Sequence, residues 1–372
     1  MHDPRIDDLA DLLVGYSCDL QRGEKILIEA IDTPSELVRS LIRRVDRAGG
    51  VPFVWQRSNQ IIRDLLLVAS EAQMRLLGEV DAALMREMDA YVGIRGNPNV
   101  SEWSDVPTDK MTLYQRHAWV PVHRDIRVPH TKWVVLRWPN PSMAQLANTS
   151  TEDFEDFYFR VCTLDYAKMS RAMEPLVELM NGTDRVRLVA SGTDLSFSIR
   201  DIPAIPCDGR NNIPDGEVFT APIRDSVEGV IQYNTPSIYH GITYEDVRFR
   251  FERGRIVEAS ASDTRSLEQV LDSDEGARYI GEFAIGFNPH VTEPMKDILF
   301  DEKIAGSIHL TPGSCYEEAS NGNESQIHWD LVLRMTPDLG GGEIYFDEQL
   351  VRKDGIFVHP DLEALNPENL IG

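Results

Sequence analysis

Residues 25–55 read KILIEAIDTPSELVRSLIRRVDRAGGVPFVW, and this stretch decides the expected architecture of the first half of the chain. The run 25–29 predicts a short buried strand because its centre is apolar. The tetrapeptide 33–36 offers a Thr or Ser N-cap and a proline for the first turn, so we expect a helix that runs to Ala48 and ends at two glycines. The run 51–55 then predicts a second strand.

The same alternation continues along the chain. A helical pattern spans about 71–88, and strand-like runs follow at 90–94 and 132–136. Strands separated by helices predict a mostly parallel sheet that is covered on both faces. We therefore expect residues 1–204 to form an α/β domain with a doubly wound sheet.

The second half has a different pattern. Residues 151–181 predict one long helix or two helices with a break, and a stretch rich in Pro and Gly at 203–216 marks a transition. Beyond it, segments with alternating apolar and polar residues dominate, among them 326–333. We therefore expect residues 205–372 to form a β-rich α+β domain. Two domains also suit a chain of 372 residues, because single cores usually stop growing below that length.

The composition is strongly acidic. The chain has 37 Lys and Arg against 61 Asp and Glu, which gives a formal net charge of −24. Such a charge repels nucleic acids and anionic bilayers, so we expect neither as a partner. Most of the excess lies late in the chain, since residues 1–204 hold 24 basic and 30 acidic side chains and residues 205–372 hold 13 and 31. A carboxylate excess indicates either a solvated surface or a site for cations.

Cysteine usage and the N-terminus indicate a cellular compartment. The four cysteines show no CxxC spacing, and the first residues lack the basic and then apolar run of a signal peptide. No stretch approaches the roughly 18 uninterrupted apolar residues that a membrane helix needs. We expect a reduced, cytoplasmic protein.

An HxD pattern at His328 and Asp330 is the most informative motif. In a strand, residues two apart project from the same face, so these side chains would form half of a metal site. The alternative is a purely structural role, in which a core histidine pairs with a neighbouring aspartate. His309 lies in an apolar, strand-like run where an unpaired imidazole would be costly. Two carboxylates in similarly apolar settings complete the candidate set: Glu217 and Glu282.

Six short motifs together resemble a known family. They occur in the order found in the thermophilic aminopeptidases of peptidase family M29, the aminopeptidase T and aminopeptidase S group. The N-terminal half is similar to that family more loosely, through 96–98 and 192–195. The six motifs are 213–222, 274–278, 281–282, 299–302, His309 followed by Tyr316, and 327–330.

This resemblance implies a cytoplasmic, homodimeric aminopeptidase that acts on peptides through a hydroxide activated by two divalent metal ions. It also implies an N-terminal α/β domain and a β-rich C-terminal domain that bears the site. Tyr316 would contact the transition state. The metal ligands carried over by motif are Glu217, Glu282, His309, His328 and Asp330.

The chemistry of these residue types agrees with a two-metal site. Three carboxylates and two imidazoles suit Zn, Co or Mn, and two such ions lower the pKa of a water and polarise a scissile carbonyl. We expect Asp330 to bridge the ions because it lies beside His328. Either Glu282 or Glu302 is expected to transfer the proton. Tyr316 would donate a hydrogen bond to the developing oxyanion, the alternative being a tyrosine buried for packing.

The sequence also departs from the family pattern. The residues 303–306 replace the usual Asn-Ala-Ala run, the segment between His309 and His328 is short, and 333–335 replaces a Met-Ile-Gly run. These changes put the substrate preference in doubt and leave a non-catalytic binding protein open.

A rival enzyme class uses part of the same residue set. Two histidines and one aspartate (His309, His328 and Asp330) form the triad of a mononuclear non-haem iron ring-cleaving dioxygenase of the dihydroxypyridine type. Glu217 and Glu282 distinguish the two enzyme classes, because a two-metal hydrolase requires them and a mononuclear oxygenase does not.

Overall fold

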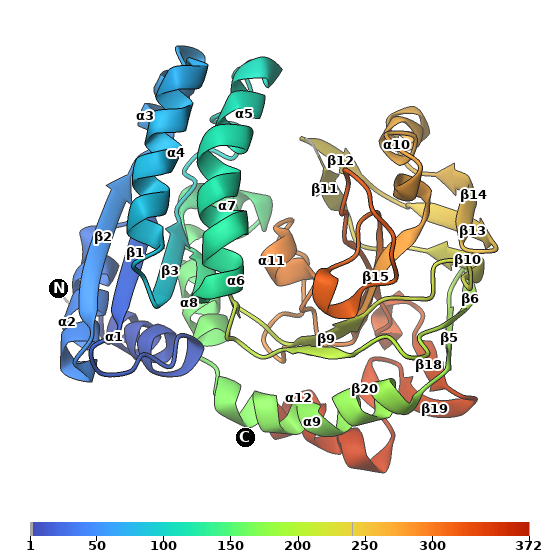
Figure 1. Ribbon diagram of the computed structural model, residues 1–372. Helices are drawn as coiled ribbons and strands as arrows, with labels where there is room; N and C mark the ends of the chain where they lie inside the picture. Colours follow the sequence, from blue (N-terminus) through green and yellow to red (C-terminus); the bar gives the residue numbers. More distant parts are fainter. Residues whose placement is uncertain (1–2, 240, 372) are drawn as a thin grey trace. The chain divides into compact units, whose positions relative to one another are not determined.

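The computed structural model describes residues 3–239 and 241–371. The chain divides into two compact units (Figure 1). Unit 1 comprises Met1–Thr163 and Gly209–Ile213, and unit 2 comprises Leu164–Asp208 and Pro214–Gly372. The boundary expected after residue 204 does not coincide with this division, because the helix after residue 164 packs within unit 2 and a short strand at 212–213 returns to unit 1.

The sheet of unit 1 is parallel throughout, as expected. Its order is β2-β1-β3-β4-β8, and Figure 1 shows β2, β1 and β3 side by side. All central residues of β1 and β3 are buried, so both faces of the sheet are covered at its centre. The strands are β1 (Lys25–Ile31), β2 (Val51–Arg57), β3 (Ala90–Arg95), β4 (Lys132–Arg137) and β8 (Asn212–Ile213).

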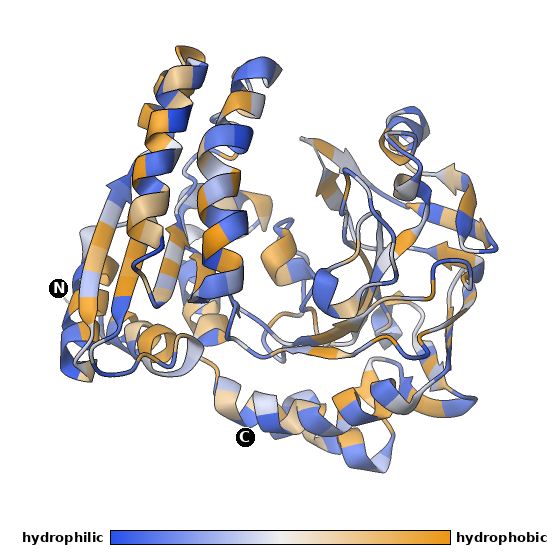
Figure 2. Ribbon diagram, viewed as in Figure 1, coloured by the Kyte–Doolittle hydropathy of each residue, from blue (hydrophilic) through white to orange (hydrophobic). Residues whose placement is uncertain are grey.

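The helix predicted between the first two strands is α2 (Ser35–Ala48). It ends at Gly49 with φ 79°, a left-handed conformation that glycine adopts without steric cost. The expected Thr or Ser cap is wrong, because Pro34 is the N-cap and no side chain bonds to the first turn. Leu37, Leu41 and Val45 are buried and face β1 and β2. Figure 2 shows apolar and hydrophilic residues along each long helix of unit 1, as helices with one buried side require.

The other helical segments of unit 1 connect the strands. None of the helices in the described ranges, in either unit, has the length and apolar character needed to cross a membrane. They are α1 (Pro4–Leu12), η1 (Leu13–Ser17), α3 (Asn59–Leu67), α4 (Glu71–Met85), α5 (Thr108–Tyr114), η2 (Gln115–Arg127), α6 (Val128–His130), α7 (Pro141–Leu146) and α8 (Thr151–Cys162).

Unit 2 is β-rich, as predicted, and its three sheets pair antiparallel. An eight-stranded sheet has the order β14-β13-β10-β6-β5-β18-β19-β20, a five-stranded sheet has the order β17-β16-β15-β9-β7, and β11 pairs with β12. The strands are β5 (Arg185–Ala190), β6 (Thr193–Ser198), β7 (Ile205–Cys207), β9 (Glu217–Thr220), β10 (Glu228–Gln232), β11 (Ser237–Tyr239), β12 (Ile242–Tyr244), β13 (Arg248–Glu252), β14 (Arg255–Ser260), β15 (Ile280–Gly286), β16 (Ser307–Pro312), β17 (Leu331–Arg334), β18 (Gly342–Phe346), β19 (Gln349–Lys353) and β20 (Ile356–Phe357).

Helices are few and mostly short in unit 2. The helical pattern at 151–181 forms two helices with a break, namely α8 in unit 1 and α9 (Tyr166–Gly182) in unit 2. The α9 helix packs against η6 and β7. The remaining segments are α10 (Thr264–Leu271), η3 (Gly276–Arg278), α11 (Ile298–Asp301), η4 (Glu317–Ala319), η5 (Pro337–Leu339), η6 (Pro360–Leu365) and α12 (Pro367–Ile371).

A charged network is buried in the sheet of unit 1. Glu29 of β1 is only 2% exposed, and Arg95 of β3 donates to it at 2.8 Å. Arg57 of β2 lies 3.5 Å away, and the Tyr91 hydroxyl donates to the same carboxylate. Burial alone would raise the pKa of Glu29, but the neighbouring cations outweigh it and lower this pKa to about 2. Glu29 is therefore ionised at neutral pH.

The neighbouring His123 gives unit 1 a testable pH dependence. Its side chain is 7% exposed, and burial lowers its pKa from 6.5 to about 4. Between about pH 4 and pH 6.5, His123 is therefore protonated in the unfolded chain and neutral in the folded chain. The free energy of unfolding should fall as the pH drops from about 6.5 to about 4, by at most about 3 kcal/mol from this residue.

His123→Phe should remove this part of the pH dependence. Urea denaturation at several pH values, followed by tryptophan fluorescence, measures it in unit 1, which holds five of the six tryptophans. The same loss of stability in the variant and in the unchanged protein would show that His123 is not its source.

Candidate metal centre

The five predicted ligands all lie in unit 2, and adjacent strands carry three of them. Glu217 opens β9, Glu282 lies in β15 and His309 lies in β16. His309 pairs with Ala284 and Glu217 pairs with Gly286, so both project from the face that Glu282 shares with these two small residues. The side chains of Glu217, Glu282 and His309 meet on this face, where His309 contacts both carboxylates.

The other two predicted ligands reach this face from a loop. The strand expected at 326–333 is wrong in its first half, because β17 begins only at Leu331 and His328 forms an isolated bridge with Gly313. His328 and Asp330 nevertheless meet, with 3.3 Å between Nε2 and Oδ1. The Thr311 hydroxyl of β16 donates to Asp330 at 2.6 Å, and Nδ1 of His328 lies 2.8 Å from the Ser314 carbonyl oxygen. These contacts orient Asp330 and His328, a role that we had expected a strand to fill.

Glu282 lies at the centre of the cluster. Its Oε1 is 3.2 Å from Nε2 of His309, and its Oε2 is 3.2 Å from Nε2 of His328. Among the described residues, one group of possible metal donors joins Glu217 to Cys207 and Asp215. Two further groups consist of predicted ligands alone, with donor atoms within 4.8 Å of one another: Glu217, Glu282 and His309, and Glu282, His328 and Asp330. The residue common to both groups is Glu282, whereas we expected Asp330 in the bridging position.

The cluster has the electrostatics of a cation site. Burial would lower the pKa of both histidines, but the adjacent carboxylates outweigh it and raise the pKa of His309 to about 10 and that of His328 to about 12. Oε2 of Glu217 and Nδ1 of His309 are buried, lie 3.5 Å apart and have no hydrogen-bond partner among the residues that the structure describes. Unpaired buried polar atoms are costly, and a metal ion would bond to both. The donor set of carboxylates and imidazoles fits Zn, Co or Mn.

Tyr316 lies at the edge of the cluster. Its ring centroid is 4.8 Å from that of His328 and 5.5 Å from that of Phe219. The residue is 48% exposed, and no hydrogen bond ties its hydroxyl to any described residue. These observations disfavour the alternative of a buried packing tyrosine.

Comparison with known proteins identifies the family. The family described as thermophilic metalloprotease (M29) matches residues 2–357. The chain belongs to the M29 family. The resemblance seen in the motifs is thereby confirmed.

Named M29 relatives cover most of this chain. Aminopeptidase T of Thermus thermophilus is 27% identical over 378 residues, which are 88% of this chain and 92% of that protein. Aminopeptidase AmpS of Bacillus subtilis is 34% identical over 367 residues, or 88% of each chain.

Two solved structures share the fold of this M29 chain. Wild-type AmpT from Thermus thermophilus matches with a TM-score of 0.78 and 24% identity, over 95% of this chain and 99% of that one. A 2,5-dihydroxypyridine dioxygenase from Pseudomonas putida matches with a TM-score of 0.61 and 12% identity, over 96% and 98%. At these identities the likeness concerns the fold alone.

Sequence reasoning missed one residue of the cluster, Lys303. It is 1% exposed, and its Nζ lies 2.5 Å from Oε1 of Glu217, 2.5 Å from Oε1 of Glu302 and 3.4 Å from Oδ1 of Asp215. Lys303 thus takes one oxygen of Glu217 and leaves the other facing His309. The only signal in the sequence was the departure of 303–306 from the usual run of the M29 family.

The M29 motif at 274–278 has a positioning role. Asp274 accepts hydrogen bonds from the backbone of Gln326 at 2.6 Å and from the Ser325 hydroxyl at 3.0 Å. The Asn323 amide donates to the carbonyl oxygens of Gly276 and Gly313. The loop that leads to His328 is held by the distant side chain of Asp274 and by the bonds of its own Asn323 to Gly276 and Gly313.

Gly281 offers a test of this positioning. A Cβ there would lie 2.4 Å from the carbonyl oxygens of Gly313 and Ser314, so Gly281→Ala must displace the carbonyl that orients His328. We expect metal affinity to fall by at least about tenfold, as it does when partners of metal ligands are lost. Competition with a chromophoric chelator measures the affinity. Gly182→Ala is the matched control, because a Cβ there meets nothing within 4 Å, and equal affinities in both variants would contradict the expectation.

Proposed function

We propose that this chain is a metal-dependent aminopeptidase that removes N-terminal residues from peptides. The sharing of Glu282 by two donor groups carries the proposal, because it supports two divalent ions held side by side. Membership of the M29 family and the named aminopeptidase relatives support the same activity. The proposed ligands are Glu217, Glu282, His309, His328 and Asp330.

The bound ions would supply a Lewis acid for the scissile carbonyl and an activated water at neutral pH. The residues of the chain supply the rest. Thr311 and the Ser314 carbonyl fix the directions of Asp330 and His328, and Lys303 fixes Glu217. The Tyr316 hydroxyl, which has no hydrogen-bond partner among the described residues, would donate to the oxyanion that develops on the substrate carbonyl.

Two carboxylates were expected to move the proton, Glu282 or Glu302. Both oxygens of Glu282 face imidazoles, which supports the role of a ligand. Glu302 has one oxygen bonded to Lys303, and none of the described residues bonds to the other. That free oxygen supports Glu302 as the group that takes a proton from water and delivers it to the departing amine.

A dipeptide panel tests the activity. The purified protein, supplied with Zn, Co or Mn in turn, should release the free N-terminal amino acid from unblocked dipeptides and none from their N-acetylated forms. Equal cleavage of blocked peptides would indicate a different peptidase specificity, and no release from any peptide with metal bound would refute the proposal.

The rival dioxygenase has weaker support. Among the described residues, the triad that it needs does not form one donor group, since His309 groups with Glu217 and Glu282 while His328 and Asp330 group with Glu282. Oxygen uptake on hydroxylated aromatic rings, with no peptide turnover, would favour it.

We also propose a cytoplasmic homodimer, in line with the M29 resemblance. All four cysteines are free, which suits a reducing compartment. Exposed apolar side chains on α3 and α4 supply a face for a second copy. Light scattering on the eluting protein measures the mass, and a monomer at all concentrations would contradict the dimer. The exposed residues are Ile61, Leu65, Leu76 and Val80.

A further inference from the structure

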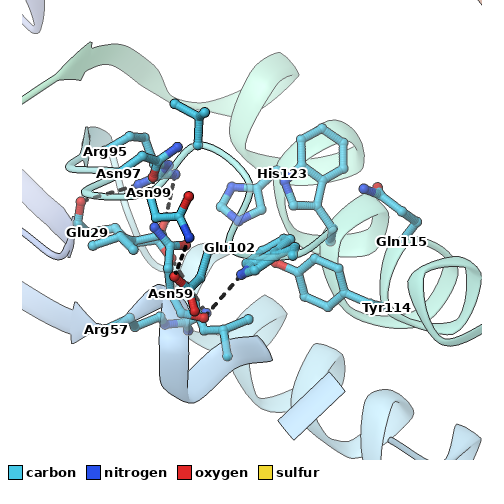
Figure 3. Close-up of a pocket in the computed structure, with 15 residues that line it drawn as sticks. Glu29, Arg57, Asn59, Arg95, Asn97, Asn99, Glu102, Tyr114, Gln115 and His123 are labelled. Atoms are coloured by element: carbon cyan, nitrogen blue, oxygen red, sulfur yellow. Dashed lines mark hydrogen bonds and ion pairs between the residues drawn. The ribbon is translucent and has the colours of Figure 1, made fainter. Parts of the chain in front are cut away.

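A cavity of about 290 Å³ lies in unit 1, and none of the residues that line it is a proposed metal ligand (Figure 3). Its floor is built from the carboxyl ends of three parallel strands, through Glu29 of β1, Arg57 of β2 and Arg95 of β3. The chain places β2 on one side of β1 and β3 on the other, so the strand order reverses between β1 and β3. In open α/β sheets, ligands bind in the crevice outside such a reversal.

His123 marks this cavity as a binding site. More than nine-tenths of the residue is buried, and its ring nitrogens have no hydrogen-bond partner among the described residues. The ring packs against Tyr91 and Trp119 at centroid distances of 5.9 and 5.5 Å. Figure 3 shows the imidazole turned into the cavity, toward Asn99. A polar group held in this way calls for a hydrogen-bonding ligand.

The charges of the residues that line the cavity favour a neutral ligand. The lining holds two arginines and two glutamates. Arg95 and Arg57 are paired with Glu29, and Arg57 also pairs with Asp81 at 2.7 Å. Since both lining arginines are already paired with carboxylates, neither is left free to recruit an anion. His123 is itself uncharged at neutral pH, because burial lowers its pKa to about 4.

The remaining walls select a flat ligand. Trp103, Tyr114 and Trp119 present aromatic rings. Asn59 donates to Asn97 at 2.7 Å, which leaves the Asn59 amide oxygen to accept from a ligand and the Asn97 NH₂ group to donate to it. Flat heterocycles with ring nitrogens and exocyclic amines combine these needs, because they stack on aromatic side chains and hydrogen-bond along their edges. We propose that the cavity binds a neutral, planar heteroaromatic molecule of nucleobase or nucleoside size, with His123 bonded to its edge.

Calorimetric titration of the full-length protein tests the proposal with four probes: adenine, uracil, adenosine and adenosine monophosphate. At least one neutral probe should bind with Kd below about 1 mM, and the phosphate should give no advantage over adenosine. No binding by any neutral probe would overturn the proposal. Binding of the monophosphate more than about tenfold tighter than adenosine would overturn the neutral ligand class.

Variants locate the site. His123→Phe keeps an aromatic ring but no nitrogen and should weaken binding at least about tenfold, while His117→Phe on the same helix lies outside the lining and should change nothing. Gln115 is exposed at the rim of the cavity, so Gln115→Ala provides a second lining variant in case His123→Phe does not fold. Gln115→Ala should weaken binding about threefold. Unchanged affinity in both lining variants would overturn the site. Glu282→Gln should bind the probe normally, which separates this result from the fate of the proposed peptidase.

Discussion

Glu282→Gln is expected to lower peptide hydrolysis by at least about a thousandfold and to leave fewer than two divalent ions bound, because one residue serves both donor groups. Each oxygen of Glu282 faces a different imidazole at 3.2 Å. A glutamine presents only one acceptor oxygen, and its NH₂ group would point at a histidine or at an ion. Both halves of the proposed centre would therefore lose a ligand.

The control for this variant is Glu293→Gln. Glu293 lies in the same unit, and its side chain is 68% exposed where it pairs with Arg334. A surface ion pair contributes little, so this variant should keep full activity and full metal content. Activity of Glu282→Gln above about a tenth of the unchanged protein, with both ions retained, would remove Glu282 from the centre.

Lys303→Met is expected to lower the free energy of unfolding of unit 2 by about 3–5 kcal/mol. The substitution removes the cation that contacts Glu217, Glu302 and Asp215, and it leaves two buried carboxylates and the partly buried Glu302 together without it. Thermal unfolding of metal-free protein, followed by calorimetry, measures the loss. Added divalent ions should raise the Tm of the variant more than that of the unchanged protein, since ions that bind only the folded state stabilise it.

Lys353→Met is the matched control for this charge removal. Lys353 pairs with Glu343 at 3.0 Å, but its side chain is 52% exposed, so the expected change is below about 1 kcal/mol. Equal stability of the two variants would mean that Lys303 does not hold the carboxylates together.

Much of the fold could be predicted because its signals are local. The strand and helix of 25–48 have an apolar centre, a regular period and a glycine stop, and the structure confirms them. The two-residue strand β8 has no period that a sequence pattern can reveal, yet it carries 209–213 back to unit 1. The loop before Leu331 resembles a strand because its residues alternate, but contacts from Asp274 and Asn323 determine its path.

For a similar reason, the sequence predicted some residues of the candidate site and missed others. Its five proposed ligands stand in motifs whose order the chain shares with its family, and the structure brings them together. Lys303 could not be assigned from its neighbours, because its partners Glu217 and Asp215 lie in a distant segment. The cavity of unit 1 had no motif at all, since Glu29, Arg57 and Arg95 meet only when three separate strands align.

We propose that one buried cluster of carboxylates and histidines holds the ions that make the protein a peptidase. Metal-stripped protein, given Zn, Co or Mn in stepwise amounts, should regain dipeptide hydrolysis in proportion to the bound ion and reach its limit near two ions per chain. Metal analysis and amino acid release on the same samples provide both quantities. Hydrolysis that persists in the stripped protein, or that stays absent at full metal occupancy, would contradict the claim.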